Sequence, residues 1–200
     1  MKKMMIILCL VLLLAGAIVV AALLWRVQQP LQSGDPTLTV ETPPRLSKTN
    51  DEEFVLDVGI SCLGEALYPA MSMSLSFDPA RLEFLGVEEG NVFVLSNETA
   101  GGYQLPSWNY DVATSNATGM INIMYLDMTG GKCAFTQNLL AEEDNVLLRL
   151  KFRMRGSVRA GDVMNLMVED AVFAASDERE SLAMTLNTLK VIDGKIVIGE

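Results

Sequence analysis

The segment MSMSLSFDPARLEFLGVEEG, residues 71–90, carries the strongest structural pattern in this 200-residue chain. From Met71 to Phe77, apolar residues alternate with serines, and a period of two is typical of a β-strand with one buried and one solvated face. Asp78-Pro79 follows as a turn signal, since proline fixes φ and aspartate caps the turn. A second, weaker strand is expected at Leu82–Val87. We therefore expect strand, turn and strand, with a purely structural role for Asp78 and Pro79.

The same alternation continues on both sides of this segment. Phe54–Cys62 and Val146–Met154 are strong strand candidates, and turn signals such as Gly130-Gly131 separate the candidates along the chain. No long amphipathic helix pattern follows residue 26, and at most a helical turn is expected over Asn138–Asp144. Five further, weaker strand candidates are Thr37–Glu41, Tyr103–Asp111, Met120–Leu126, Val163–Phe173 and Leu189–Ile198.

Nine strands without helical crossovers must pair largely antiparallel, in two sheets packed face to face. The predicted fold class is therefore all-β, a nine-stranded β-sandwich. On Val146–Met154 the outward Arg149 and Lys151 are expected to form a solvated face that discourages edge-to-edge pairing. The residues expected in the core of the two clearest strands are Met73, Leu75, Phe77, Leu148, Leu150 and Phe152.

The N-terminal segment predicts a membrane anchor. Residues 4–25 contain no charge, and a helix of that length spans a hydrocarbon core of about 30 Å. Lys2 and Lys3 before it favour a single pass with the N-terminus cytoplasmic and the C-terminal domain extracellular. The alternative is a cleaved signal peptide, because Ala15-Gly16-Ala17 fits the small-x-small rule, although the apolar run continues past it. The predicted organisation is a signal anchor over residues 1–26, a short linker over 27–36 and one β domain over 37–200.

The composition excludes several function classes. The chain has no histidine, which removes Ser-His-Asp and Cys-His catalysis and histidine-ligated zinc. We expect no catalytic residue and no cofactor, so the chain is not predicted to be an enzyme. After residue 26 it has 12 basic and 25 acidic residues, a net charge of −13 that disfavours nucleic-acid binding. No metal site is predicted, because the carboxylate clusters lack the spacing of a calcium loop; they are Glu88-Glu89, Asp127 and Glu142-Glu143-Asp144.

Some side chains allow two interpretations. Trp108 and Tyr110 lie two residues apart on one side of the expected strand, where they can stack on a sugar ring or fill the sandwich core. Cys62 and Cys133 can form a disulfide outside the cell, but Cys62 falls on an apolar strand face, which favours two separate thiols. The glycosylation sequons Asn97-Glu98-Thr99 and Asn116-Ala117-Thr118 are functional only in a compartment with the transferase.

Four segments together resemble the cohesin domain of bacterial cellulosomes. They are LSFDPARLEFLGVEEGNVF (residues 75–93), GMINIMYLDMTG (119–130), NVLLRLKFRMRG (145–156) and VIDGKIVIGE (191–200). The resemblance runs over about residues 37–200. It implies a nine-stranded jelly-roll sandwich used for adhesion rather than chemistry. It also implies a binding partner, which is either a dockerin module on a polysaccharide-degrading enzyme or a polysaccharide.

The family resemblance also indicates a recognition face. The strands that form it correspond here to Met71–Phe77, Tyr103–Asp111, Met120–Leu126 and Val163–Phe173. Where dockerin-binding relatives commonly present Asn and Asp, this chain has Ala70 and Ser72. On Met120–Leu126 we expect Ile121, Ile123 and Tyr125 to be buried, and the opposite parity is the alternative. The candidate partner-binding residues are therefore Ser72, Ser74, Ser76, Asn122, Met124 and Leu126.

The predicted function is a non-catalytic extracellular adhesion module anchored to the cell membrane through residues 4–25. It would bind a dockerin-like module or a polysaccharide during polysaccharide degradation or surface assembly. The alternative is a structural accessory domain of an envelope complex that binds neither.

Overall fold

The computed structural model divides the chain into two units, Met1–Ser33 and Gly34–Glu200. The predicted membrane segment at 4–25 lies outside the described residues, so the anchor stays a prediction. Within the described residues, no helix is long and apolar enough to cross a membrane. The structure describes residues 34–42, 46, 53–64, 66–92, 96–141, 144–156, 158–176 and 183–199.

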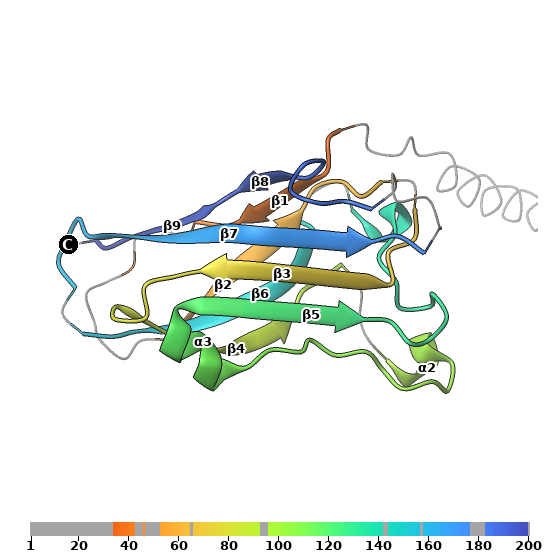
Figure 1. The fold of residues 1–200 in the computed structure, drawn as a ribbon, viewed down its shortest axis with the longest axis horizontal. Helices are drawn as coiled ribbons and strands as arrows, with labels where there is room; N and C mark the ends of the chain where they lie inside the picture. Colours follow the sequence, from red (N-terminus) through yellow and green to blue (C-terminus); the bar gives the residue numbers. More distant parts are fainter. Residues whose placement is uncertain are drawn as a thin grey trace, which may run out of the picture. The chain divides into compact units, whose positions relative to one another are not determined.

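Two packed sheets form the second unit, as Figure 1 shows. The five-stranded sheet has the order β4 (Leu82–Glu89), β6 (Val146–Met154), β2 (Glu53–Ile60), β1 (Thr37–Val40) and β8 (Lys190–Ile192). The four-stranded sheet has the order β5 (Met120–Leu126), β3 (Ala70–Ser76), β7 (Val163–Ala174) and β9 (Gly194–Val197). Neighbouring strands are antiparallel except β1 and β8, which run parallel. The prediction of an all-β sandwich with nine strands in the described part of the chain is confirmed.

The alternation of side chains builds the core between the sheets. In β3, and in β6 from Leu148 onward, every second residue is buried, and Phe77 directly after β3 is buried as well. All six core residues expected from the sequence are therefore inside, which confirms both registers. Phe152 lies at the centre of an aromatic cluster, with its ring 5.6 Å from that of Phe77 and 5.7 Å from that of Phe84. Edge-to-face and tilted rings at such distances add to the stability from burial alone.

The last predicted strand, Leu189–Ile198, is in fact two strands in different sheets. β8 pairs with β1, and β9 pairs with β7, so the chain crosses between the sheets at Asp193. Gly194 makes this crossing possible, because a Cβ there would lie 2.6 Å from Val40 Cγ1. The buried side changes parity at the crossing, since Val191 is the least exposed residue of β8 whereas Gly194 and Ile196 are the buried residues of β9.

The predicted strand Tyr103–Asp111 is wrong. Only Asn109 pairs in this segment, as an isolated bridge to Met124 at the edge of β5. A short helix that was not expected, α3 (Val112–Thr118), follows it. The other short helices described are α2 (Asn97–Ala100) and a single 3₁₀ turn, η1 (Gln137–Leu139), close to the helical turn expected over 138–144.

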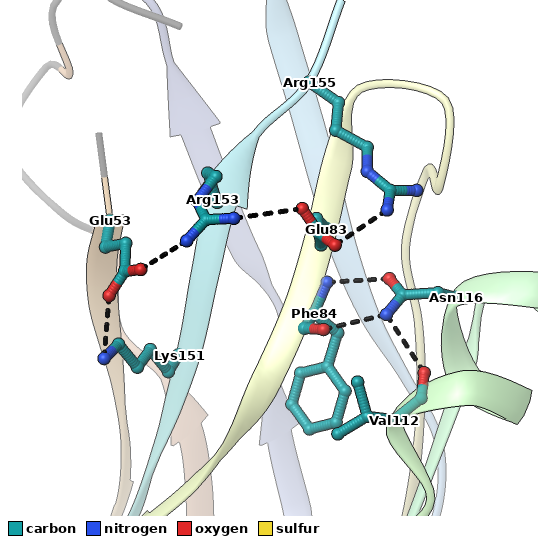
Figure 2. Close-up of polar contacts among 8 residues, drawn as sticks. All are labelled: Glu53, Glu83, Phe84, Val112, Asn116, Lys151, Arg153 and Arg155. Carbon is teal, nitrogen blue, oxygen red and sulfur yellow. Dashed lines mark hydrogen bonds and ion pairs between the residues drawn. The ribbon is translucent and has the colours of Figure 1, made fainter. Parts of the chain in front are cut away.

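The segment 103–119 instead closes one side of the sandwich, between β5 and β4. Asp111 caps α3 by accepting a hydrogen bond from the Thr114 backbone N–H at 2.6 Å, which holds the Asp111 pKa below its ordinary value. At the other end Gly119 takes the left-handed conformation with φ 73°, where glycine is favoured. Asn116 on α3 hydrogen-bonds to the backbone of β4 (Figure 2), so the helix is fixed against the edge of the sheet.

The outer face of the five-stranded sheet is covered by ion pairs (Figure 2). Glu53 of β2 contacts Lys151 at 2.7 Å and Arg153 at 2.5 Å. Glu83 of β4 contacts Arg153 at 3.6 Å and Arg155 at 2.8 Å. The role expected for the outward cations of β6 is therefore wrong, because β6 lies between β4 and β2 and has no free edge to protect. These cations are half-buried and join three strands by their charges.

Candidate binding face

The outer face of β5, β3, β7 and β9 is the candidate site, and we call it the four-strand face. The outward residues of β5 and β3 are those expected from the sequence, since Ile121, Ile123 and Tyr125 are buried. The face consists of Met120, Asn122, Met124 and Leu126 on β5; Ala70, Ser72, Ser74 and Ser76 on β3; Val163, Asn165, Met167, Glu169, Asp170, Val172 and Ala174 on β7; and Lys195 and Val197 on β9.

Strand register arranges these side chains in rows across β5, β3 and β7. One row is Leu126, Ala70 and Ala174, and the next is Met124, Ser72 and Val172. Met124 is 55% exposed and Leu126 45% exposed, which is unusual for large apolar side chains on a regular sheet. Because the neighbouring residues on β3 are small, the side chains of Met124 and Leu126 project from the surface of the sheet. These two rows form an apolar half of the face.

The following row is polar. It contains Asn122, Ser74 and Asp170, and the Ser74 hydroxyl donates to Asn122 Oδ1 at 2.7 Å. Next to it, the Ser76 hydroxyl donates to Glu169 Oε1 at 2.7 Å. All these hydrogen bonds are solvent-exposed, so a partner can replace or extend them at little cost.

Sequence reasoning placed β7 in this face but named none of its residues as candidate binding residues. The register of β3 against β7 shifts by one residue, pairing Ser74 with Asp170 but Leu75 with Val168. Glu169 is the extra residue of this β-bulge, and as a result both Glu169 and Asp170 are exposed. Two consecutive acidic residues do interrupt the alternation of this mostly apolar strand in the sequence, but the position of the bulge depends on the pairing with β3.

The possible sugar-stacking residues lie beside this face, on the segment that closes the sandwich. Trp108 is half-buried, with its ring 5.0 Å from that of Tyr125 and 6.2 Å from that of Phe135. Tyr110 packs edge-on to Phe84 at 5.8 Å. Both rings therefore contact core aromatic residues, as expected if they pack against the sandwich core rather than stack on a sugar.

Other candidate groups are engaged in the structure. Cys133 is a free buried thiol, so the alternative of a Cys62–Cys133 disulfide is not realised. Asp127 is buried and accepts hydrogen bonds from the backbone N–H groups of Thr129 and Gly131, at 2.8 and 2.9 Å. Burial raises the pKa of Tyr125, whose hydroxyl donates to Cys133 O at 2.6 Å. The residues that the structure describes include no group of three or more carboxylates and thiols placed to hold a metal.

Asp78 and Pro79 occupy the turn before β4. Asp78 Oδ1 accepts a hydrogen bond from the Ala80 N–H at 3.0 Å, and its carbonyl accepts from the Leu82 N–H at 2.9 Å. The carboxylate also lies 3.5 Å from the Arg81 guanidinium. These contacts are local and stabilise the turn itself.

Comparison with known proteins agrees with this architecture. The family model of the cohesin domain matches residues 42–193. The third cohesin of ScaC from Acetivibrio cellulolyticus, solved with the ScaB dockerin, aligns with a TM-score of 0.58 at 13% identity, over 82% of this chain and 99% of that one. The OlpA cohesin of Clostridium thermocellum, solved with a dockerin, gives 0.58 at 14% identity, with coverage of 82% and 99%.

A third similar structure comes from outside cellulosomes. The non-cellulosomal cohesin of the archaeon Archaeoglobus fulgidus aligns with a TM-score of 0.54 at 14% identity, over 84% of this chain and 93% of that one. No curated protein sequence matches the chain. At these identities the structural likeness shows the fold alone.

The outer face of the five-stranded sheet is covered by ion pairs, whereas the four-strand face exposes large apolar side chains. The match over residues 42–193 shows that the chain belongs to the cohesin domain family. Cohesin domains are non-catalytic interaction modules, which agrees with the expectation that the chain is not an enzyme.

Proposed function

We propose that this chain is a membrane-anchored extracellular cohesin domain that binds a dockerin-like protein module through the four-strand face. The observation that carries the proposal is the pair Met124 and Leu126, large apolar side chains exposed on a regular sheet beside small serines. Exposed apolar groups that lie together on a flat surface commonly mark a protein interface. The dockerin complexes of the similar structures support the choice of partner.

The test is binding by the full-length chain, purified in detergent, to dockerin modules encoded in the same genome, each expressed singly. Ser74→Arg and Met124→Glu place a large or charged group in the centre of the face and should abolish binding. Val55→Glu is the matched control, since Val55 is an exposed apolar residue on the outer face of β2 in the other sheet. Normal folding of all three variants is checked by thermal unfolding.

The result also discriminates between the remaining functions. If both face variants bind dockerin like the wild type, the four-strand face is not the site. Retention of the wild-type chain by a polysaccharide panel, without dockerin binding, would favour a carbohydrate-binding role. Binding to neither would favour an accessory domain of an envelope complex.

The membrane anchor has its own test. N-terminal sequencing of the protein extracted from membranes should start at the initiating residues, because we propose that residues 4–25 remain in the mature protein. A mature N-terminus near Ile18 would show cleavage after Ala15-Gly16-Ala17 and would reject the anchor.

A further inference from the structure

The outer faces of the two sheets differ in whether their charged side chains form ion pairs. On the outer face of the five-stranded sheet, Glu53, Glu83 and Asp57 each lie within 3.6 Å of a lysine or arginine. Every one of these acidic residues is thus compensated inside the domain. A surface with such internal compensation offers little net charge to a partner.

The four-strand face has no ion pair of this kind among the described residues, and the one cation among its residues is Lys195 on β9, which lies opposite Asn165. The sequences of β5, β3 and β7 contain no lysine or arginine, whereas Glu169 and Asp170 are both exposed on β7. Among the described residues, no cation lies within ion-pair distance of either carboxylate. The β-bulge turns both of them outward, so the charge on this face is concentrated at one place.

This acidic pair lies next to the apolar half of the face. Asp170 is in the row of Ser74, and Val172 is in the adjoining row with Met124. Rows two residues apart are separated by about 7 Å along the strand, and neighbouring strands by about 5 Å. A single partner segment can therefore contact the apolar rows and the carboxylates together.

We propose that the partner presents apolar side chains to Met124, Leu126 and Val172 and a lysine or arginine to Glu169 and Asp170. This inference rests on the proposed function and specifies the chemistry of the dockerin-like partner, a basic and amphipathic contact surface. Such a pairing supplies both terms that specific interfaces use, apolar burial for affinity and charge complementarity for specificity and association rate.

A second copy of this chain fits the face poorly. It would bring a further net charge of −13 from its residues after 26, and its four-strand face offers a single cation, Lys195 on β9. Like charges facing each other across an interface oppose association. A neutral polysaccharide also fits poorly, because it has no cation to place beside the two carboxylates.

The experiment uses two labelled helical peptides that differ at one position. Both peptides carry leucines along one face of the helix. One helical turn beyond the leucines, on the same face, the first peptide has a lysine and the second has a glutamate. Binding to the full-length chain in phosphatidylcholine nanodiscs is followed by fluorescence anisotropy, with empty nanodiscs as the blank. The lysine peptide should bind more tightly than the glutamate peptide, and the difference should vanish at about 1 M salt, where the Debye length is about 3 Å.

Variants then locate the contact. Asp170→Asn should weaken binding of the lysine peptide about twofold to fivefold, as for an exposed ion pair. Asp170→Lys should reverse the preference in favour of the glutamate peptide. Met124→Glu should weaken both peptides, and Glu83→Gln, on the other sheet, should leave both unchanged. Equal binding of the two peptides to the wild type, absence of lysine-peptide binding, or indifference to both Asp170 variants would overturn the inference.

Binding of dockerin modules to the wild type and to Asp170→Lys tests this inference separately from the proposed function. If a dockerin binds the wild type and Asp170→Lys with equal affinity, the proposed function stands and the basic partner surface is rejected. If no dockerin binds while the lysine peptide shows the expected dependence on Asp170 and Met124, the chemistry of the face stands and dockerin is rejected as the partner.

Discussion

The side-chain amide of Asn116 forms two hydrogen bonds to the backbone of Phe84, one in each direction and both 2.8 Å long (Figure 2). Its nitrogen donates to the Phe84 carbonyl, and its oxygen accepts from the Phe84 N–H. The amide thus replaces the neighbouring strand that the edge strand β4 lacks at this position. Unpaired strand edges promote aggregation, and a side chain bound in this way blocks one. The same nitrogen would carry the glycan if the sequon at Asn116 were used.

Replacing Asn116 should therefore destabilise the sandwich. Asn116→Ala removes both hydrogen bonds and leaves two backbone groups of Phe84 without these partners. We expect the free energy of unfolding to fall by about 1–3 kcal/mol, partly offset by the better helix propensity of alanine. Urea denaturation measures the change. Asn122→Ala is the control, because Asn122 is exposed on β5 and its loss should change stability by less than about 0.5 kcal/mol. An equal effect of the two substitutions would mean that water satisfies the Phe84 backbone N–H and carbonyl as well as Asn116 does.

Leu150 and Ser74 test the register of the two central strands. Leu150 is completely buried in β6, so Leu150→Ala should cost about 2–5 kcal/mol of unfolding free energy. Ser74→Ala removes only an exposed hydrogen bond to Asn122 and should be nearly neutral. Thermal or chemical unfolding of both variants is sufficient. A costly Ser74→Ala would contradict the side-chain alternation of β3 seen in the structure.

These two strands also show what the sequence can predict. β3 alternates throughout, and β6 alternates from Leu148 onward, although Leu147 at its start is also buried. Since one side of each strand is core and the other is solvent, their bounds to within one residue and most of their buried residues follow from period two alone. The segment around Trp108 and Tyr110 has the same spacing without being a strand. Its rings pack against the core aromatic residues Phe84 and Tyr125, and only Asn109 pairs with β5, a difference set by tertiary packing.

Helix α3 was missed because most of its residues are weak helix formers, in the sequence VATSNAT. Its boundaries were nevertheless readable, since Asp111 is a favourable N-cap and Gly119 a favourable C-terminal glycine. On the candidate site, the alternation predicted the outward residues of β3 and β5. It could not predict the acidic pair on β7, because a β-bulge shifts parity at a point that depends on pairing with β3.

Acid should weaken the domain through Glu53. Hydrogen bonds first from Lys151 and then from Arg153 lower the pKa of Glu53 below its ordinary value of 4.5. A carboxylate with a lower pKa in the folded state contributes stability that is complete above its unfolded pKa and is lost as the pH falls through the folded one. The urea midpoint should therefore drop on acidification below about pH 5.

Glu53→Gln should reduce the loss of stability in acid without abolishing it. Part of the remaining loss comes from the Asp111 cap, whose pKa is also lowered in the folded state. The same contact raises the pKa of Lys151, so its contribution is complete below the unfolded pKa and is lost as the pH rises through the folded one. An unchanged acid response in Glu53→Gln would show that the contact with Lys151 and Arg153 is not maintained in solution.

Methionine oxidation should report on the four-strand face. Met124 and Met167 lie on the face, and Met128 follows β5 with 68% of its surface exposed, whereas Met71 on the inner side of β3 is 1% exposed. Peroxide transfers one oxygen atom to the thioether sulfur and is reduced to water, and accessible sulfurs react first. Peptide mapping by mass spectrometry after mild peroxide treatment should find sulfoxide at these three positions well before Met71.

The sulfoxide is polar, so oxidation of Met124 should weaken binding of the lysine peptide and of any dockerin bound by the wild type. Met124→Leu keeps an apolar side chain without a sulfur; it should bind like the wild type before peroxide treatment and lose less affinity after it. If Met71 oxidised as fast as Met124, the sandwich would have to open on the timescale of the reaction, and the four-strand face could not be described as the surface of a closed core.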